Sequence, residues 1–267
     1  MATRELPNEK SAIRNSGSII DSLLDISFVH GSLVIMPQTE GKHFLPGFDQ
    51  ALESVKADSL LMANLVSRNF GNARTGFAKR DEDFCAAVIA DDEEVDLLEK
   101  QVHRAGTDVL MRFQPMVIDL RTVLVTVKLA SHLERISDYT VTIARRTRSL
   151  ITDDKEIEEA KLLDGLFDSV QKLFAEAIGA FNSIDVARAG WVQGQVEALA
   201  EQARGMTEKF TDLIEERSFA SRIYVGLMAI AQALEEIIYL CSRIAEDVIY
   251  IVEARDIRHP GNHLAQE

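Results

Sequence analysis

The stretch "SHLERISDYTVTIARR", residues 131–146, places two carboxylates inside an apolar helical pattern. Successive residues of an α-helix rotate by about 100°, so positions four apart project along one stripe. Glu134 and Asp138 are four apart and continue a stripe that is otherwise apolar. A second apolar face lies roughly opposite, so we expect this helix to be covered on two sides. That face consists of Val125, Leu129, Leu133, Ile136 and Ile143.

The preceding stretch, "ADDEEVDLLEKQVH", carries a second polar stripe that consists of Asp92, Asp96, Glu99 and His103. Pro115 separates the two stretches, and proline is tolerated in the first turn of a helix but not inside one. If the two helices form an antiparallel hairpin that turns at Pro115, residues that face each other have numbers adding to about 230. Asp96 then lies level with Glu134, and Asp92 lies level with Asp138. The hairpin predicts four carboxylates at two adjoining heights.

Carboxylates gathered on a packing face repel one another and lose hydration, so protonation, basic partners or a metal cation must compensate. Oxygen-rich clusters suit Mg, Mn or Fe ions, and Zn is also possible. In the simpler alternative, residues 91–94 form an acidic first turn favoured by the helix dipole, and Glu134 pairs with Arg135 or another basic side chain at the surface. The Glu-x-x-His pattern of ferritin-like di-iron proteins is missing, because Glu99 and His103 are four positions apart.

The chain repeats itself at an offset of 101 residues, which aligns Glu134 with Glu235 and also aligns the apolar positions around them. We therefore predict an all-α fold of two tandem three-helix bundles, residues 46–151 and 152–256. Residues 1–45 form an N-terminal extension of uncertain structure, and residues 257–267 form a polar tail. Thr152 or Asp153 is expected to cap the second bundle. The expected helices span about 47–78, 81–113, 115–150, 154–182, 185–215 and 218–254.

Composition narrows the classes of partner. The formal net charge of −14 disfavours nucleic acid and anionic lipid, since both bind to basic surfaces. Cys85 and Cys241 stand far apart and are expected to be small buried residues in a reducing compartment. His132 and His259 are expected to be structural or exposed. We find neither a signal peptide nor an apolar window of about 18 residues, so the chain is predicted to be cytoplasmic and at most peripheral to a membrane.

Several motifs resemble those of the PhoU family. "LERISDYTVTIA" resembles its Glu-Arg-Ile-Gly-Asp signature, "FQPMVIDLR" and "VKLASHLERISD" its connection into that helix, and "ADDEEVDLLEKQV" its preceding acidic helix. "IAEDVIYIVEARDIRH" resembles its C-terminal ending, so the resemblance covers about residues 46–260.

The resemblance implies a cytoplasmic all-α regulator of phosphate uptake and of phosphate-starvation signalling. Its partners would be a phosphate-specific ABC transporter and a sensor histidine kinase, and it would often be a homodimer. Family members bind multinuclear metal clusters through paired Glu/Asp-x-x-x-Asp motifs. Carried over, these motifs are Asp92 with Asp96 and Glu134 with Asp138.

The second repeat departs from the family pattern. Tyr239 stands where aspartate is expected, and Gln193 stands where the first repeat has Asp92. Only Glu197 and Glu235 keep their charge, so we expect a full metal site in the first bundle and a weak or empty one in the second. The N-terminal extension is a further departure.

Three functions compete on the sequence alone. The leading one is a metal-binding regulator that acts through protein contacts and has no catalysis of its own, because no nucleophile, base and oxyanion arrangement is found. The second is a metalloenzyme that uses the carboxylates for redox or hydrolytic chemistry. The third is a helical scaffold with an unmetallated acidic stripe, whose thermal stability chelators would leave unchanged.

Overall fold

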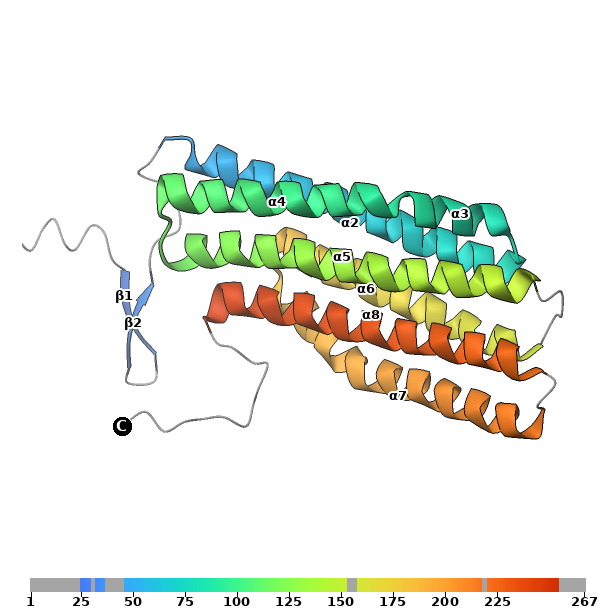
Figure 1. Cartoon of the computed structure of the whole chain (residues 1–267). Coiled ribbons are helices and arrows are strands. Elements are labelled where there is room, and N and C mark those ends of the chain that lie inside the picture. The colour runs from blue at the N-terminus through green and yellow to red at the C-terminus, as the bar shows by residue number, and fades with distance from the viewer. Residues whose placement is uncertain (1–24, 30–31, 37–45, 153–157, 218–219, 255–267) are drawn as a thin grey trace, which may run out of the picture. The chain divides into compact units, whose positions relative to one another are not determined.

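The computed structural model describes residues 25–29, 32–36, 46–152, 158–217 and 220–254. Its helices confirm the predicted all-α class, and Figure 1 shows them as long, roughly parallel rods. The chain divides into two units, Met1–Asp49 and Gln50–Glu267. The helices are α2 (Phe48–Lys79), α3 (Glu82–Ala90), α4 (Asp92–Phe113), α5 (Val117–Thr152), the 3-10 helix η2 (Glu158–Leu163), α6 (Asp164–Ser183), α7 (Val186–Glu216) and α8 (Ser221–Glu253).

A tight turn joins α2 to α3. Asp81 caps α3, because its side chain accepts a hydrogen bond from the backbone N–H of Asp83 (2.9 Å). Gly76 lets the two helices approach closely, since a Cβ at this position would lie 2.7 Å from Cys85 Sγ. The single helix expected over residues 81–113 is divided at Asp91 into α3 and α4.

The hairpin between α4 and α5 turns where the sequence predicted. Gln114 adopts the left-handed conformation (φ 45°), and its N–H bonds to the carbonyl of Leu110 (3.1 Å), which ends α4. Pro115 follows in the turn and α5 begins at Val117. This turn sets the register that brings the acidic stripes of α4 and α5 together.

The start of the second repeat differs from the prediction. A helix was expected from about residue 154, but η2 precedes α6, which begins only at Asp164. Thr152 is the last residue of α5, and its hydroxyl donates to the carbonyl of Arg148 (3.0 Å), so its predicted role as an N-cap is wrong. Asp153, the alternative cap, lies outside the described residues. Asp185 caps α7 by accepting a hydrogen bond from the N–H of Arg188 (3.0 Å).

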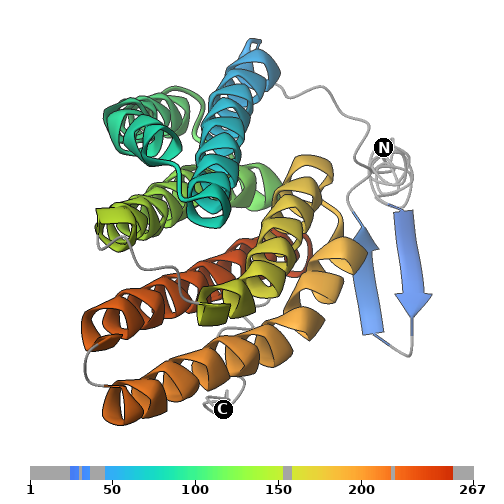
Figure 2. The same cartoon turned by 90° about the vertical axis from the view of Figure 1, so that its right-hand side faces the viewer.

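The third helices of the two repeats, α5 and α8, pack against each other in the middle of the helical unit. Figures 1 and 2 show α3 and α4 beyond α5, and α7 beyond α8. The expectation that no apolar window of about 18 residues exists is wrong, because by length and composition α8 could cross a membrane, although 61% of its apolar stretch is buried inside the structure. Its central place in the core therefore accounts for its apolar composition. Both cysteines are buried and free, as expected, and burial raises the pKa of the Cys85 thiol to about 11.

A buried acidic side chain links α5 and α8. Asp247 on α8 accepts a hydrogen bond from Lys128 Nζ on α5 (2.6 Å), and its other oxygen lies 3.2 Å from His132 Nε2. Burial by itself would raise the pKa of Asp247, but the contacts with His132 and Lys128 outweigh it and hold the pKa below its ordinary value. His132 is thus structural, as predicted. His259 lies outside the described residues.

The N-terminal unit contains a β-hairpin that the sequence prediction left open. Strand β1 (Asp25–Val29) pairs antiparallel with β2 (Ser32–Met36), with Asp25 opposite Met36 and Val29 opposite Ser32. Both strands are rich in β-branched, aromatic and other apolar residues, which favour extended structure. The remainder of the predicted extension and the predicted tail 257–267 lie outside the described residues.

Candidate metal centre

Helices α4 and α5 lie side by side (Figure 1), and the four predicted carboxylates belong to them, Asp92 and Asp96 to α4 and Glu134 and Asp138 to α5. Ser137 Oγ on α5 donates a hydrogen bond to Asp92 Oδ1 on α4 (3.3 Å), which places Asp92 at the predicted height. Asp92, Asp96 and Glu134 are half-buried, whereas Asp138 is exposed. The acidic cluster of these four residues therefore lies at the rim of the helix pair, open to solvent on one side.

The cluster makes Glu134 hard to ionise. Burial raises the pKa of Glu134, and four neighbouring negative charges raise it further, to about 7. Those charges belong to Asp138, Glu99, Asp96 and Asp92. The structure thus brings the four predicted carboxylates within electrostatic reach of one another and adds Glu99 to them.

A shallow hollow opens beside the exposed end of the cluster. It is lined by Asp92 and Asp138 together with two basic side chains, Arg135 and Arg145. Burial raises the pKa of Asp92, and the charges of Asp138 and Asp96 add to this, while the Ser137 hydrogen bond and Arg145 oppose it. The net result is a raised pKa, so these contacts compensate the burial and the like charges only in part.

Glu134 has no basic partner among the residues that the structure describes: the surface pair with Arg135 considered from the sequence is not formed. Within the same residues, no three His, Cys, Asp or Glu side chains converge on a point that could hold an ion. The cluster therefore has the negative charge and the oxygen donors of a cation site, but its side chains are not arranged around a common point. The assignment of Asp92, Asp96, Glu134 and Asp138 as metal ligands stays a prediction.

Glu99 extends the cluster along α4 and was not among the predicted ligands. Ser131 Oγ on α5 donates to Glu99 Oε1 (3.0 Å) and lies 2.9 Å from His103 Nε2. His103 Nε2 is also 3.5 Å from Glu99 Oε1. The signal was present in the sequence, because Glu99 lies three residues after Asp96 and so falls on the same helix stripe.

The second repeat fills the equivalent place with an arginine. Arg204 on α7 donates from Nη2 to Glu197 Oε1 (2.7 Å) and from Nη1 to Glu235 Oε1 (3.2 Å). Nη1 also donates to the hydroxyl of Tyr239 (2.8 Å). The two weaker candidates for metal binding, Glu197 and Glu235, are thus brought together, but by a guanidinium from the chain itself. The internal offset of 101 residues aligns Arg204 with His103.

Gln193, which replaces the first aspartate of the motif, is also bonded within the protein. Its Nε2 donates to the carbonyl of Ser242 on α8 (2.7 Å), and its Oε1 accepts from the Ser242 hydroxyl (3.1 Å). A neutral amide satisfied on both atoms leaves no charge for a cation to neutralise. The second-repeat cluster, defined as Gln193, Glu197, Arg204, Glu235 and Tyr239, is therefore closed by its own hydrogen bonds.

Residues 60–147, which run from α2 through most of α5, match the family model described as the PhoU domain. This stretch of the chain is similar to the PhoU domain. This confirms the resemblance seen in the sequence motifs. The matched residues contain α4, most of α5 and all four predicted ligands.

Similarity to PhoU proteins extends beyond the matched domain. A phosphate-specific transport system accessory protein PhoU from Serratia marcescens is 25% identical over 221 residues, which cover 82% of this chain and 90% of the relative. A PhoU homologue of the same description from Pseudomonas putida is 28% identical over 220 residues, covering 82% and 86%. Alignments of this length span both repeats.

Solved structures agree with the fold. The crystal structure of PhoU from Pseudomonas aeruginosa superposes with a TM-score of 0.76 at 25% identity, covering 78% of this chain and 100% of that one. The regulatory protein PhoU of the phosphate transport system from Streptococcus pneumoniae has a TM-score of 0.73, with 79% and 99% covered. Its 19% identity supports the shared fold alone.

Proposed function

We propose that this chain is a cytoplasmic regulator of phosphate uptake and phosphate-starvation signalling. It acts through protein contacts with a phosphate-specific ABC transporter and a sensor histidine kinase, and has no catalysis of its own. The observation that carries this proposal is the similarity to accessory proteins of phosphate transport over 82% of the chain. We also expect a homodimer, which light scattering coupled to size-exclusion chromatography would test.

The first-repeat acidic cluster is the proposed metal site of this regulator. Asp92, Asp96, Glu134 and Asp138 would hold a divalent or trivalent ion such as Fe, Zn, Mn or Mg, because oxygen donors suit such ions. The proposal is supported by the raised pKa of Glu134, since ionised carboxylates need a positive charge to offset their repulsion. Asp138 is exposed, so its side chain has room to rotate towards an ion. A bound ion would offset part of the negative charge of the cluster and join α4 to α5.

The second repeat is not part of the proposed site. Arg204 already supplies a positive charge to Glu197 and Glu235. An ion would have to displace the guanidinium and its hydrogen bonds before reaching these oxygens. We therefore propose that the regulator takes up metal through its first repeat only.

Metal analysis of purified protein tests the site. The variant Glu134→Ala with Asp138→Ala should lose most of the metal that the wild type carries. Glu208→Ala with Asp212→Ala is the matched control, because these residues have the same Glu-x-x-x-Asp spacing on α7 and are exposed. Equal metal content in the wild type and in the Glu134/Asp138 variant would contradict the site assignment.

Co-purification with the transporter ATPase and with the sensor kinase of the same cell tests the regulatory part. We expect at least one of them to be retained by the wild-type protein at moderate salt. Failure to retain either one, with a folded protein, would contradict the proposed role while leaving the metal analysis unaffected. Turnover assays on the metal-loaded protein with phosphate esters and peroxide should show no activity above that of the free metal.

A further inference from the structure

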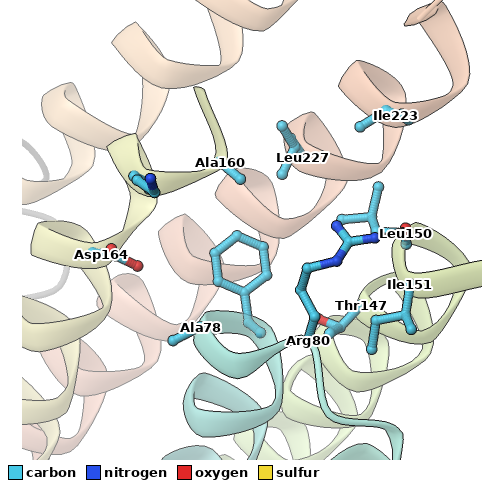
Figure 3. Close-up of a pocket in the computed structure, with 11 residues that line it drawn as sticks. Ala78, Arg80, Thr147, Leu150, Ile151, Ala160, Asp164, Ile223 and Leu227 are labelled. Carbon is cyan, nitrogen blue, oxygen red and sulfur yellow. Dashed lines mark hydrogen bonds between the residues drawn. The ribbon is translucent and has the colours of Figure 1, made fainter. Parts of the chain in front are cut away.

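A cavity of about 150 Å³ lies at the end of the helical unit opposite the α4–α5 turn. Its wall comes from both repeats, namely the last turns of α2 and α5 and the first turns of α6 and α8, together with η2 (Figure 3). The wall is mainly apolar. Its large apolar side chains are Phe77, Leu150, Ile151, Ile223 and Leu227.

Basic groups stand at this otherwise apolar cavity. Arg80 lies beside Leu150 on the α5 side of the cavity (Figure 3), where its Nη2 donates to the carbonyl of Leu150 (3.1 Å). Lys161 lines the mouth and forms no hydrogen bond or ion pair with the described residues, and Asp164 lies nearby. Among the described residues that line the cavity, two cations and one anion give a net positive charge, in a protein whose formal net charge is −14.

A buried hydroxyl in the same wall lacks a partner. Thr147 is 1% exposed, and its Oγ1 has no hydrogen-bond partner in the described part of the chain. Other buried threonines of α5, such as Thr126 and Thr140, donate to the carbonyl four residues earlier. An unsatisfied buried hydroxyl costs free energy, so a polar partner at this place would be stabilising.

We propose that this cavity binds a small aromatic or branched-chain carboxylate. The apolar part would pack against α5 and α8, and the carboxylate would lie beside Arg80 and Lys161, with Thr147 as a further donor. The volume fits such a ligand, since an engineered apolar cavity of about 150 Å³ in another protein accommodates benzene. The ligand would contact both repeats, so its binding stabilises their association. This proposal is independent of the regulatory function proposed above.

Calorimetric titration with benzoate and with benzamide tests the proposal on the full chain. The two probes have nearly the same shape, but only benzoate carries a charge. We expect benzoate to bind in the millimolar range and benzamide at least about fivefold more weakly, because only the carboxylate gains charge-assisted hydrogen bonds. Lys161→Gln should reduce the difference in affinity between benzoate and benzamide. Benzamide binding as tightly as benzoate would overturn the proposed ligand class.

Substitutions that fill the cavity test whether benzoate binds inside it. Ala160→Phe places a ring inside the cavity wall and should abolish benzoate binding, whereas Ala198→Phe makes the same change at an exposed position on α7 and should not. Ile151→Phe is the second filling variant, used if circular dichroism shows that Ala160→Phe does not fold. Absence of saturable benzoate binding to the wild type, or unchanged binding in a folded filled variant, would overturn the proposed site.

Discussion

The second and third helices of each repeat form equivalent pairs, α4 with α5 and α7 with α8. The acidic side chains of the two pairs have opposite electrostatic surroundings. In the first repeat, Glu134 has carboxylates as neighbours and its pKa rises to about 7. In the second repeat, Glu235 receives a hydrogen bond from Arg204, which also binds Glu197 and Tyr239. The second repeat thus has an internal cation beside its glutamates, whereas the first repeat has an excess of negative charge.

The comparison between the repeats shows that the acidic cluster lacks a basic side chain beside Glu134. Charge repulsion on a half-buried helix face can be relieved by a basic side chain, by protonation or by an ion from solution. The second repeat relieves it with a basic side chain. The first repeat has no such partner for Glu134 in the described residues, so protonation and an external ion are the routes left to it.

The largest expected effect concerns the contact between the repeats. Asp247→Asn removes the negative charge that faces Lys128 and His132, and leaves two donors beside a neutral amide. Breaking a largely buried ion pair costs about 2–3 kcal/mol, or roughly 5–10 °C in the melting temperature of a chain of this size. Thermal unfolding at pH 7 measures this loss.

The same variant has a defined pH dependence. Because the folded-state pKa of Asp247 is lowered, its contribution to stability is present above the ordinary pKa of an aspartate and is lost as pH falls through the folded-state value. Asp247→Asn should therefore differ from the wild type at pH 7 and converge with it in strong acid. Asp212→Asn, at an exposed position on α7, is the control and should leave stability unchanged.

Arg204→Ala should make the second repeat resemble the first. Loss of the guanidinium leaves Glu197 and Glu235 without their shared cation, and we expect the melting temperature to fall by about 2–4 °C, since solvent screens this exposed network. Added Mn²⁺ or Mg²⁺ should then recover part of the loss, because an ion can take the place of the guanidinium. Scanning calorimetry with and without the ion measures both effects.

Arg104→Ala is the matched control for this experiment, since Arg104 is an exposed arginine on α4. It should change the melting temperature little. Equal melting temperatures for the two variants would show that Arg204 does not hold the second-repeat cluster together.

Glu134→Gln should stabilise the chelator-treated protein at alkaline pH. The pKa of Glu134 in the fold is about 7, above the ordinary value near 4.3, so the folded state binds its proton more tightly and stability falls as pH rises from about 4.3 to 7. Glutamine removes this dependence. The gain at pH 8 should be about 1 kcal/mol, after allowance for solvent screening, and should be near zero below pH 5.

Denaturant unfolding at the two pH values measures this gain. Glu208→Gln, an exposed position on α7, is the control and should be neutral at both. A loss of stability in Glu134→Gln at pH 8 would contradict the electrostatic account of the cluster. In the presence of a bound ion the sign should reverse, because the variant loses a proposed ligand.

Much of the fold could be predicted from the sequence because the apolar periodicity of the helices is strong and Pro115 marks the hairpin. The register of α4 and α5 followed from this turn and brought the acidic residues together. The interruption at Asp91 and the 3-10 helix η2 could not be predicted, because both depend on local hydrogen bonds within an otherwise helical pattern. The β-hairpin was missed since its short apolar strands lack a decisive period.

The site could be predicted only in part. The spacing of residues shows which carboxylates lie level with each other on paired helices. It does not show which long basic side chain from elsewhere on a helix contacts them. Arg204 is a full seven residues from Glu197 on α7, and its reach to α8 depends on the side-chain conformation. Glu99 lies on the polar stripe seen in the sequence, but it is not a predicted ligand because the hairpin register places it level with Ser131 and not with a carboxylate.

The smallest expected loss of stability concerns the hydroxyl of Tyr239, which lies beside the guanidinium of Arg204. Tyr239 accepts a hydrogen bond from Arg204 Nη1 (2.8 Å) and lies 3.4 Å from Glu235 Oε1, so Tyr239→Phe removes one polar contact of Arg204 and keeps the ring. At a position this exposed, the melting temperature should fall by only about 1 °C. Tyr250→Phe controls for the loss of a hydroxyl elsewhere on α8.

The decisive comparison is the double variant. If the hydroxyl acts by orienting the guanidinium, Tyr239→Phe should have no effect in the Arg204→Ala background, since contacting residues are energetically coupled and independent ones are additive. An unchanged effect of Tyr239→Phe in that background would show that the phenol stabilises α8 by itself. The tyrosine that replaced the aspartate of the first repeat would then have no part in how the second repeat holds its internal cation.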